Sequence, residues 1–167
     1  MKKGNIILIG MPGSGKTTIG TELSEKIGYG YIDSDSVIVA REGMRLPQII
    51  EAKGREGFLD IEAKVNSELC ADRCVIATGG SVIYRASAME KLKTLGTVVY
   101  LKLSYETIKS RLGDLKARGV ALKEGFTLKD LYEERAPLYE KYADIAVELD
   151  GKTVMESVKT LMEAIQK

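Results

Sequence analysis

Short apolar runs alternate along this chain with longer segments whose apolar residues recur at helical spacing. The apolar runs are typical of buried strands and lie at residues 5–9, 29–32, 74–77, 97–103 and 145–149. The segments with helical spacing lie at residues 16–27, 35–42, 47–53, 56–70, 86–95, 105–112, 128–142 and 153–165. Strands that alternate with helices predict a three-layer α/β/α domain, in which helices cover both faces of a mostly parallel sheet.

Glycine and proline residues mark where several of these helices should end or bend. Gly28 follows the first helical segment, and Gly54 follows the third, which has Pro47 near its first turn. Pro137 is expected to kink the long helix that contains it, because its ring excludes a backbone hydrogen bond. Residues 113–127 are charged, contain glycines and show no clear period, so they are the best candidate for a mobile loop.

The amino-acid composition limits the number of domains, the partners and the compartment that can be expected for this chain. A chain of 167 residues suits one domain, and 44% apolar with 29% charged residues is an ordinary soluble composition. Its 25 basic and 24 acidic residues leave a net charge of +1, so we expect no nucleic-acid or membrane partner. No apolar run approaches the roughly 20 residues of a membrane span, and the cytoplasm is the expected compartment.

The chain contains no histidine, which excludes several catalytic arrangements. Neither a Ser-His-Asp triad nor a Cys-His pair can form, so a general base must be Asp, Glu, Lys, Tyr or Cys. A structural zinc site normally needs four ligands. Cys70 and Cys74 are therefore interpreted as ordinary reduced, half-buried thiols.

The segment from Gly10 to Thr17 reads GMPGSGKT and fits the phosphate-binding pattern G-x-x-x-x-G-K-[ST] without a mismatch. It follows an apolar strand and opens an amphipathic helix, which favours a phosphate site over an ordinary glycine turn. Glycines let backbone N–H groups turn toward an anion, and the helix N-terminus adds a positive dipole. The residues predicted to bind the nucleotide here are Gly13, Ser14, Gly15, Lys16, Thr17 and Thr18.

Two carboxylates follow the second predicted strand. Asp33 and Asp35 stand two residues apart, so in an extended segment their side chains point the same way. Because the carboxyl ends of parallel strands meet at the ligand crevice, one carboxylate could support Mg²⁺ and the other could orient an attacking hydroxyl. The alternative is that Asp35 caps the following helix.

Together these motifs resemble the shikimate kinase family, within the nucleoside-monophosphate-kinase-like P-loop fold. The resemblance runs nearly the full length and rests on Gly10–Thr17, Asp33-Ser34-Asp35, Phe58 with Glu62, Gly79-Gly80, Arg111, Arg118 and Arg135-Ala136-Pro137-Leu138-Tyr139. It implies a five-stranded parallel sheet in a single domain over residues 1–167. It also implies an acceptor-binding helical region at about residues 37–61 and a lid at about residues 113–125.

The resemblance implies MgATP as the phosphoryl donor. Thr17 and Asp33 would support Mg²⁺, while Lys16 would reach the β- and γ-phosphates. Arg111 would lie against the adenine, and Arg118 would reach the transferring phosphoryl group from the lid. Closure of a lid would exclude water and so limit hydrolysis of ATP. The alternative for Arg118 is a solvated loop arginine.

On the acceptor side, the resemblance gives Asp35 the role of base toward the acceptor hydroxyl. Gly79 and Gly80 would offer backbone N–H groups to the acceptor, and Arg135 would hold its carboxylate. Each of these residues also has a simpler reading. Gly79-Gly80 could form a plain turn, and Arg135 could form a surface ion pair with Glu134.

Three positions depart from the family pattern. Leu59 stands where the family has an arginine that grips the acceptor carboxylate, and Arg55, one helical turn earlier, is a candidate to compensate. Loss of such a bidentate contact is expected to cost several kcal/mol of acceptor binding, on the order of a buried charge losing its partner. Thr78 replaces one glycine of a triplet, and Gly119-Val120-Ala121-Leu122 replaces the usual Pro-Leu-Leu of the lid.

The sequence therefore predicts a monomeric kinase that transfers phosphate from MgATP to a hydroxyl of a small carboxylate metabolite. Shikimate, giving shikimate 3-phosphate in aromatic amino-acid biosynthesis, is the leading acceptor. Because the departures fall on the acceptor side, a gluconate-like or homoserine-like hydroxy acid stays open, with Asp60 holding the ammonium group of homoserine. A nucleotide-binding module without catalysis is a third reading.

Overall fold

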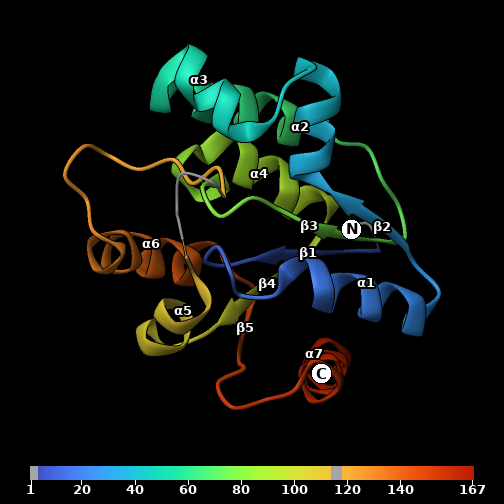
Figure 1. The fold of residues 1–167 in the computed structure, drawn as a ribbon. Helices are drawn as coiled ribbons and strands as arrows, with labels where there is room; N and C mark the ends of the chain where they lie inside the picture. The colour runs from blue at the N-terminus through green and yellow to red at the C-terminus, as the bar shows by residue number, and fades with distance from the viewer. Residues whose placement is uncertain (1–3, 114–117) are drawn as a thin grey trace.

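The computed structural model describes residues 4–113 and 118–167, which form a three-layer α/β/α domain (Figure 1). The central sheet has five parallel strands in the order β2-β3-β1-β4-β5. The strands are β1 (Asn5–Ile9), β2 (Gly30–Asp33), β3 (Cys74–Ala77), β4 (Gly96–Lys102) and β5 (Ile145–Glu148). The predicted fold class is therefore confirmed, and each predicted strand lies within a few residues of its expected position.

Helices lie on both faces of the sheet, with α4 on one side and α1 and α7 on the other (Figure 1). The α-helices are α1 (Lys16–Ile27), α2 (Ser34–Glu42), α3 (Leu46–Glu68), α4 (Ala86–Leu95), α5 (Tyr105–Arg111), α6 (Leu128–Tyr142) and α7 (Val154–Gln166). A short 3₁₀ helix, η1 (Val82–Tyr84), follows the loop after β3 and was not predicted from the sequence. Within the described residues, no helix is both long and apolar enough to cross a bilayer.

The predicted helix ends are largely those observed. Gly28 ends α1 in the left-handed conformation, at a φ of 70°, which glycine adopts without steric cost. Gly54 has a φ of 72° and a ψ of 176°, so it breaks α3 into the two helical segments predicted on either side of it. Pro137 lies inside α6, which continues through it to Tyr142.

The apolar residues form two clusters. The larger one surrounds the sheet, where β1 is buried along its whole length, as expected for a parallel strand with helices on both faces. The smaller one brings Ala121, in the segment predicted to be the lid, together with α2 and α3 and consists of Ile38, Ile49, Phe58, Leu59, Val65 and Ala121. This second cluster positions one side of the site.

Candidate active site

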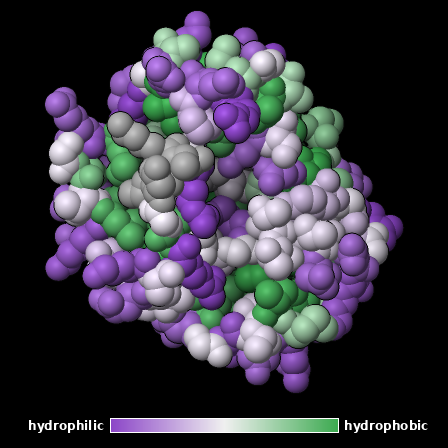
Figure 2. Space-filling view, viewed as in Figure 1, coloured by the Kyte–Doolittle hydropathy of each residue, from purple (hydrophilic) through white to green (hydrophobic). Residues whose placement is uncertain are grey.

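A cavity of about 450 Å³ opens at the carboxyl ends of β1, β2 and β3. Loops after these strands line it, together with side chains from α3 and α6 and residues 118–121 of the lid. All of the predicted site residues line this cavity except Ser14, which is buried beneath the phosphate-binding loop. Figure 2 shows a hollow near the centre of this face, edged largely by hydrophilic residues. The sheet topology thus brings together residues separated by more than 100 positions.

The phosphate-binding loop holds a buried cation. Lys16 Nζ donates to the carbonyl oxygens of Gly10 and Met11, at 2.7 and 2.8 Å, and to Ser14 Oγ at 3.3 Å. Burial lowers the pKa of Lys16 to about 8, although the negative charge of Asp35 opposes the shift. Among the described residues, no carboxylate lies within ion-pair distance of the Lys16 ammonium group.

The loop backbone also fits an anion. Gly13 and Gly15 have φ values of 78° and 92°, which a side chain rarely permits, and α1 begins directly at Lys16. The first amides of α1 and the unpaired Lys16 ammonium group therefore form one electropositive cradle. These residues fit the phosphates of a nucleotide.

The two carboxylates after β2 lie close together, but not in an extended segment as predicted. Asp33 ends β2 and caps α2, because its Oδ1 accepts from the backbone amides of Asp35 and Ser36 at 3.0 and 3.2 Å. Asp35 is already in the first turn of α2, since α2 begins at Ser34. The extended arrangement predicted for this pair was wrong, and the capping residue is Asp33 rather than Asp35. Both carboxylates nevertheless line the cavity.

A third carboxylate faces Asp35, and the sequence analysis gave it no role. Glu62 is buried on α3; its Oε1 accepts from Ser81 Oγ at 2.7 Å, and its Oε2 has no hydrogen-bond partner. Asp35 Oδ1 is likewise buried and unpaired. A Cβ placed on Gly79 would meet these two oxygens at 2.5 and 2.7 Å, so both converge on Gly79. The match of Glu62 to the family pattern was the signal that pointed to it.

Burial, together with the charge of a neighbouring carboxylate, raises the pKa values of Asp35 and Glu62. Burial raises the pKa of Asp35 to about 6, and the charge of Asp33 adds to the shift. Burial raises the pKa of Glu62 to about 7, with Ser81 opposing the shift and the charge of Asp35 adding to it. Two buried oxygens without donors, on groups that ionise near neutral pH, are suited to accept hydrogen bonds from substrate hydroxyls.

Arg135 projects from α6 to the acceptor side and is only 1% exposed. Its Nε donates to Tyr84 Oη at 3.2 Å, and its Nη2 donates to the carbonyl of Ala121 at 3.2 Å. The proposed surface ion pair with Glu134 is not formed, because Glu134 pairs with Lys123 at 2.9 Å. Within the described part of the chain, Arg135 is a buried cation with neutral partners only, which suits a carboxylate ligand.

Two further arginines lie where the nucleotide is expected. Arg111 ends α5 and donates through Nη1 to the carbonyl of Gly13 at 3.3 Å. Arg118 donates through Nη2 to the carbonyl of Arg111 at 3.4 Å, so both arginines lie beside the phosphate-binding loop. Part of the predicted lid, residues 114–117, lies outside the described residues. The mobility expected of the lid stays a prediction.

Comparisons with known proteins agree with this geometry. The family model for shikimate kinase matches residues 12–166. The chain belongs to the shikimate kinase family. A shikimate kinase from Pseudomonas paraeruginosa is 38% identical over 166 residues, which cover 98% of this chain and 96% of that protein. One from Persephonella marina is 33% identical and is covered over 99% of its length.

Solved structures of this family share the fold over its whole extent. A shikimate kinase from Acinetobacter baumannii, in complex with shikimate, superposes with a TM-score of 0.90 at 35% identity. The match covers 98% of this chain and 93% of that one. A gluconokinase from Sinorhizobium meliloti, at 18% identity and a TM-score of 0.58, shares the fold alone.

Proposed function

We propose that this protein phosphorylates the 3-hydroxyl of shikimate with MgATP, as a step of aromatic amino-acid biosynthesis. The observation that carries the proposal is that one cavity contains both a cation suited to a carboxylate and carboxylate oxygens suited to hydroxyl groups. Among the described residues, Arg135 is a buried cation with neutral hydrogen-bond partners only, which suits a carboxylate, while Asp35 and Glu62 each have an unpaired oxygen that suits a hydroxyl group. A hydroxy carboxylate satisfies both, and relatives of this chain over its full length are shikimate kinases.

On the nucleotide side, the amides of residues 13–18 and the Lys16 ammonium group would hold the phosphates. Thr17 and Asp33 would hold Mg²⁺, which usually takes few protein ligands besides water and phosphate oxygens. When bound, MgATP supplies the phosphoryl group and the divalent charge that neutralises the phosphates. Arg111 would contact the adenine, and Arg118 would approach the transferring group.

On the acceptor side, Asp35 would accept a hydrogen bond from the attacking hydroxyl and then take its proton. The backbone amides of Gly79 and Gly80 would hold the other side of the acceptor, while Arg135 fixes its carboxylate. Such positioning supplies most of the rate in phosphoryl transfer, because the reaction needs little covalent assistance from the protein. We expect the protein to act as a monomer in the cytoplasm.

The homoserine reading loses its main support in this structure. It assigned Asp60 to an ammonium group, but Asp60 is 71% exposed and accepts from Arg85 Nε at 3.1 Å. Asp60 is also not among the residues that line the cavity. Asp60 is therefore not positioned to bind the ammonium group of homoserine.

ATP consumption by the purified protein, measured with a panel of acceptors, tests the proposal. The panel contains shikimate, homoserine, gluconate and a nucleoside monophosphate, each with and without Mg²⁺. We expect shikimate alone to stimulate ATP consumption strongly, and only when Mg²⁺ is present. Stimulation by another acceptor would replace shikimate in the proposal, and no stimulation by any acceptor would favour the non-catalytic module.

A further inference from the structure

Leu59, the position that departs most from the family pattern, is apolar and buried. Leu59 is 1% exposed and packs in the cluster that contains Phe58, Val65 and Ala121. Its side chain offers no charge to an acceptor and does not line the cavity. If acceptor binding uses two cations, the second must come from another residue.

Arg55 lies one helical turn before Leu59 on α3, with an unusual environment. Its guanidinium carbon lies 4.9 Å from the centre of the Tyr84 ring, and its side chain is only 18% exposed. The Nε atom of Arg55 is buried and has no hydrogen-bond partner. A buried donor without an acceptor destabilises the fold, so this donor is suited to a ligand.

The same ring contacts the arginine assigned to the acceptor carboxylate. The guanidinium carbon of Arg135 lies 5.2 Å from the centre of the Tyr84 ring, whose hydroxyl accepts from Arg135 Nε. Tyr84 therefore holds two guanidinium groups at its ring, both shielded from solvent. A carboxylate bound within reach of both guanidinium groups would pair with two positive charges.

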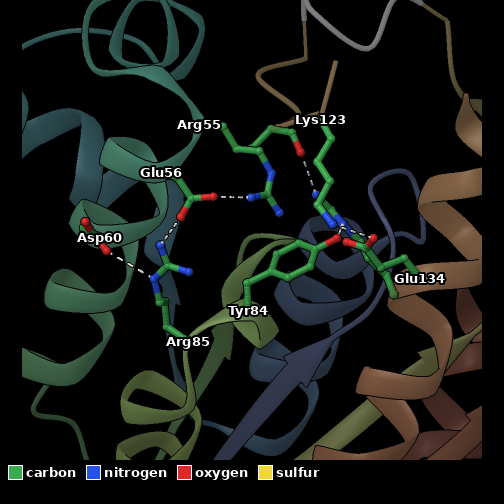
Figure 3. A network of polar contacts seen from close by, with 9 residues as sticks. Arg55, Glu56, Asp60, Tyr84, Arg85, Lys123 and Glu134 are labelled. Atoms are coloured by element: carbon green, nitrogen blue, oxygen red, sulfur yellow. Dashed lines mark hydrogen bonds and ion pairs between the residues drawn. The ribbon is translucent and has the colours of Figure 1, made fainter. Parts of the chain in front are cut away.

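The present partner of Arg55 is easily exchanged. Arg55 Nη1 pairs with Glu56, which is 67% exposed and also pairs with Arg85 Nη2 at 2.6 Å. Figure 3 shows the Arg55 guanidinium between this shared carboxylate and the Tyr84 ring. An ion pair with an exposed carboxylate contributes little to stability, whereas a desolvated arginine–carboxylate bond is stronger, so an acceptor carboxylate can displace Glu56.

We propose that Arg55 replaces the missing family arginine and binds the acceptor carboxylate together with Arg135. This inference rests on the proposed function. In it, Tyr84 holds both guanidinium groups in place. Arg55 does not line the cavity in this structure, so binding requires its side chain to turn from Glu56 toward the cavity, past Phe58, which lines the cavity one turn further along α3. Arg55 is then a residue that determines acceptor specificity, and it takes no part in the transfer itself.

Steady-state kinetics of Arg55→Met test this role, with Arg85→Met as the matched control. Methionine keeps an apolar stem against Tyr84 and removes the charge, while Arg85 shares Glu56 but is not one of the cations at the Tyr84 ring. We expect Arg55→Met to raise the KM for shikimate by about 10- to 100-fold, the loss typical of a hydrogen bond to a charged group. The KM for ATP should change by less than about twofold, as should both constants in Arg85→Met.

A neutral acceptor separates binding of the carboxylate from a purely structural role of Arg55. With the carboxamide of shikimate, Arg55→Met and the unsubstituted protein should have the same acceptor KM, because no carboxylate remains for Arg55 to bind. Arg55→Lys keeps the charge but loses the planar fork, so it should give an intermediate KM with shikimate. Arg55→Lys also replaces Arg55→Met as the test variant if Arg55→Met fails to fold.

Two results would overturn the inference. One is an acceptor KM for Arg55→Met, or for Arg55→Lys if Met does not fold, that matches the control Arg85→Met. The other is an equal rise in KM for shikimate and its carboxamide, which would mean that Arg55 only supports the local structure. If the unsubstituted protein does not phosphorylate shikimate at all, the proposed function itself fails, and this inference fails with it.

Discussion

At the scale of single residues, the described part of the site is defined by buried cations that have no ion-pair partner and by buried carboxylate oxygens that have no hydrogen-bond donor. Lys16 and Arg135 are buried cations, and Asp35 and Glu62 each have a buried oxygen that no donor reaches. In a stable fold such groups are usually satisfied, because each unpaired group costs free energy. Here they all surround one cavity, so their missing partners are expected to be the substrates.

The ionisation of Asp35 predicts the acid limb of the pH–rate profile. Since its pKa is raised to about 6, Asp35 gains a proton below that pH and cannot accept the hydroxyl proton. We expect kcat/KM for shikimate to fall tenfold per pH unit well below pH 6, with a midpoint near 6. Asp35→Asn should remove acceptor-dependent turnover and leave ATP binding, measured by titration calorimetry, largely unchanged.

Glu62→Gln provides the control for this assignment. The variant should retain an acid limb with its midpoint near pH 6, because Asp35 remains. A limb near pH 7 that disappears in Glu62→Gln would instead assign the base to Glu62, whose pKa is about 7.

Glu62 also makes folding stability depend on pH. Its pKa rises from 4.5 in the unfolded chain to about 7 in the fold, so the folded protein binds the proton more tightly. The resulting stabilisation is complete below pH 4.5 and is lost as the pH rises through 7. Urea unfolding without ligands should therefore show Glu62→Gln to be more stable than the unsubstituted protein at pH 8, by on the order of 2 kcal/mol.

At pH 4 the difference between Glu62→Gln and the unsubstituted protein should nearly vanish, because Glu62 is then largely protonated in both the folded and the unfolded chain. A variant that is less stable by the same amount at both pH values would show that Glu62 contributes through packing or through Ser81.

At the scale of elements, the acceptor-binding region is organised by the break in α3. Gly54 adopts a conformation that only glycine takes readily, and it allows the chain to change direction just before Arg55. The following turns of α3 place Phe58 and Glu62 at the cavity and Leu59 in the apolar cluster beside it. The sequence predicted this break, because a glycine between two segments of helical spacing is a common stop signal.

The lid is joined to the acceptor-binding region by direct contacts. Ala121 packs in the smaller apolar cluster, and its carbonyl accepts from Arg135. Gly119 lies so close to α3 that an added Cβ would meet Leu46 Cβ at 2.7 Å. In a segment without the usual Pro-Leu-Leu, a glycine and an alanine make these contacts with α3 and α6.

At the scale of the whole molecule, the two apolar clusters predict uneven stability. Hydrogen exchange without ligands should be slowest in β1 and β4, which lie at the centre of the larger cluster. Exchange should be faster in α2 and in residues 118–125, which contribute few buried apolar residues: Ile38 and Ala121 in the smaller cluster and Val120 in the larger one. Mass spectrometry should then show that MgATP with shikimate slows exchange in α2 and residues 118–125 much more than in β1. Equal slowing in all of these segments would contradict this division.

Much of the fold and half of the site followed from the sequence alone. The alternation of apolar and amphipathic segments determined a parallel sheet between helices, because burial on both faces leaves that pattern along the chain. The phosphate-binding loop could also be recognised in the sequence, since its residues are contiguous and its chemistry depends on local backbone geometry. Asp33 and Asp35 were found, but their conformation was not, because a helix begins one residue earlier than the pattern suggested.

Only the tertiary structure showed how the acceptor side is arranged, although Asp35, Gly79, Gly80 and Arg135 were predicted there from the sequence. Glu62 faces Asp35, and Arg55 shares a tyrosine ring with Arg135, through contacts between residues 27 to 80 positions apart that no local pattern records. Burial likewise settled which charged groups lack partners, since exposure and pairing depend on how the elements pack together. The sequence thus determined the fold and the nucleotide loop through local physics. The acceptor's surroundings emerged only when strands and helices distant in the chain enclosed one cavity.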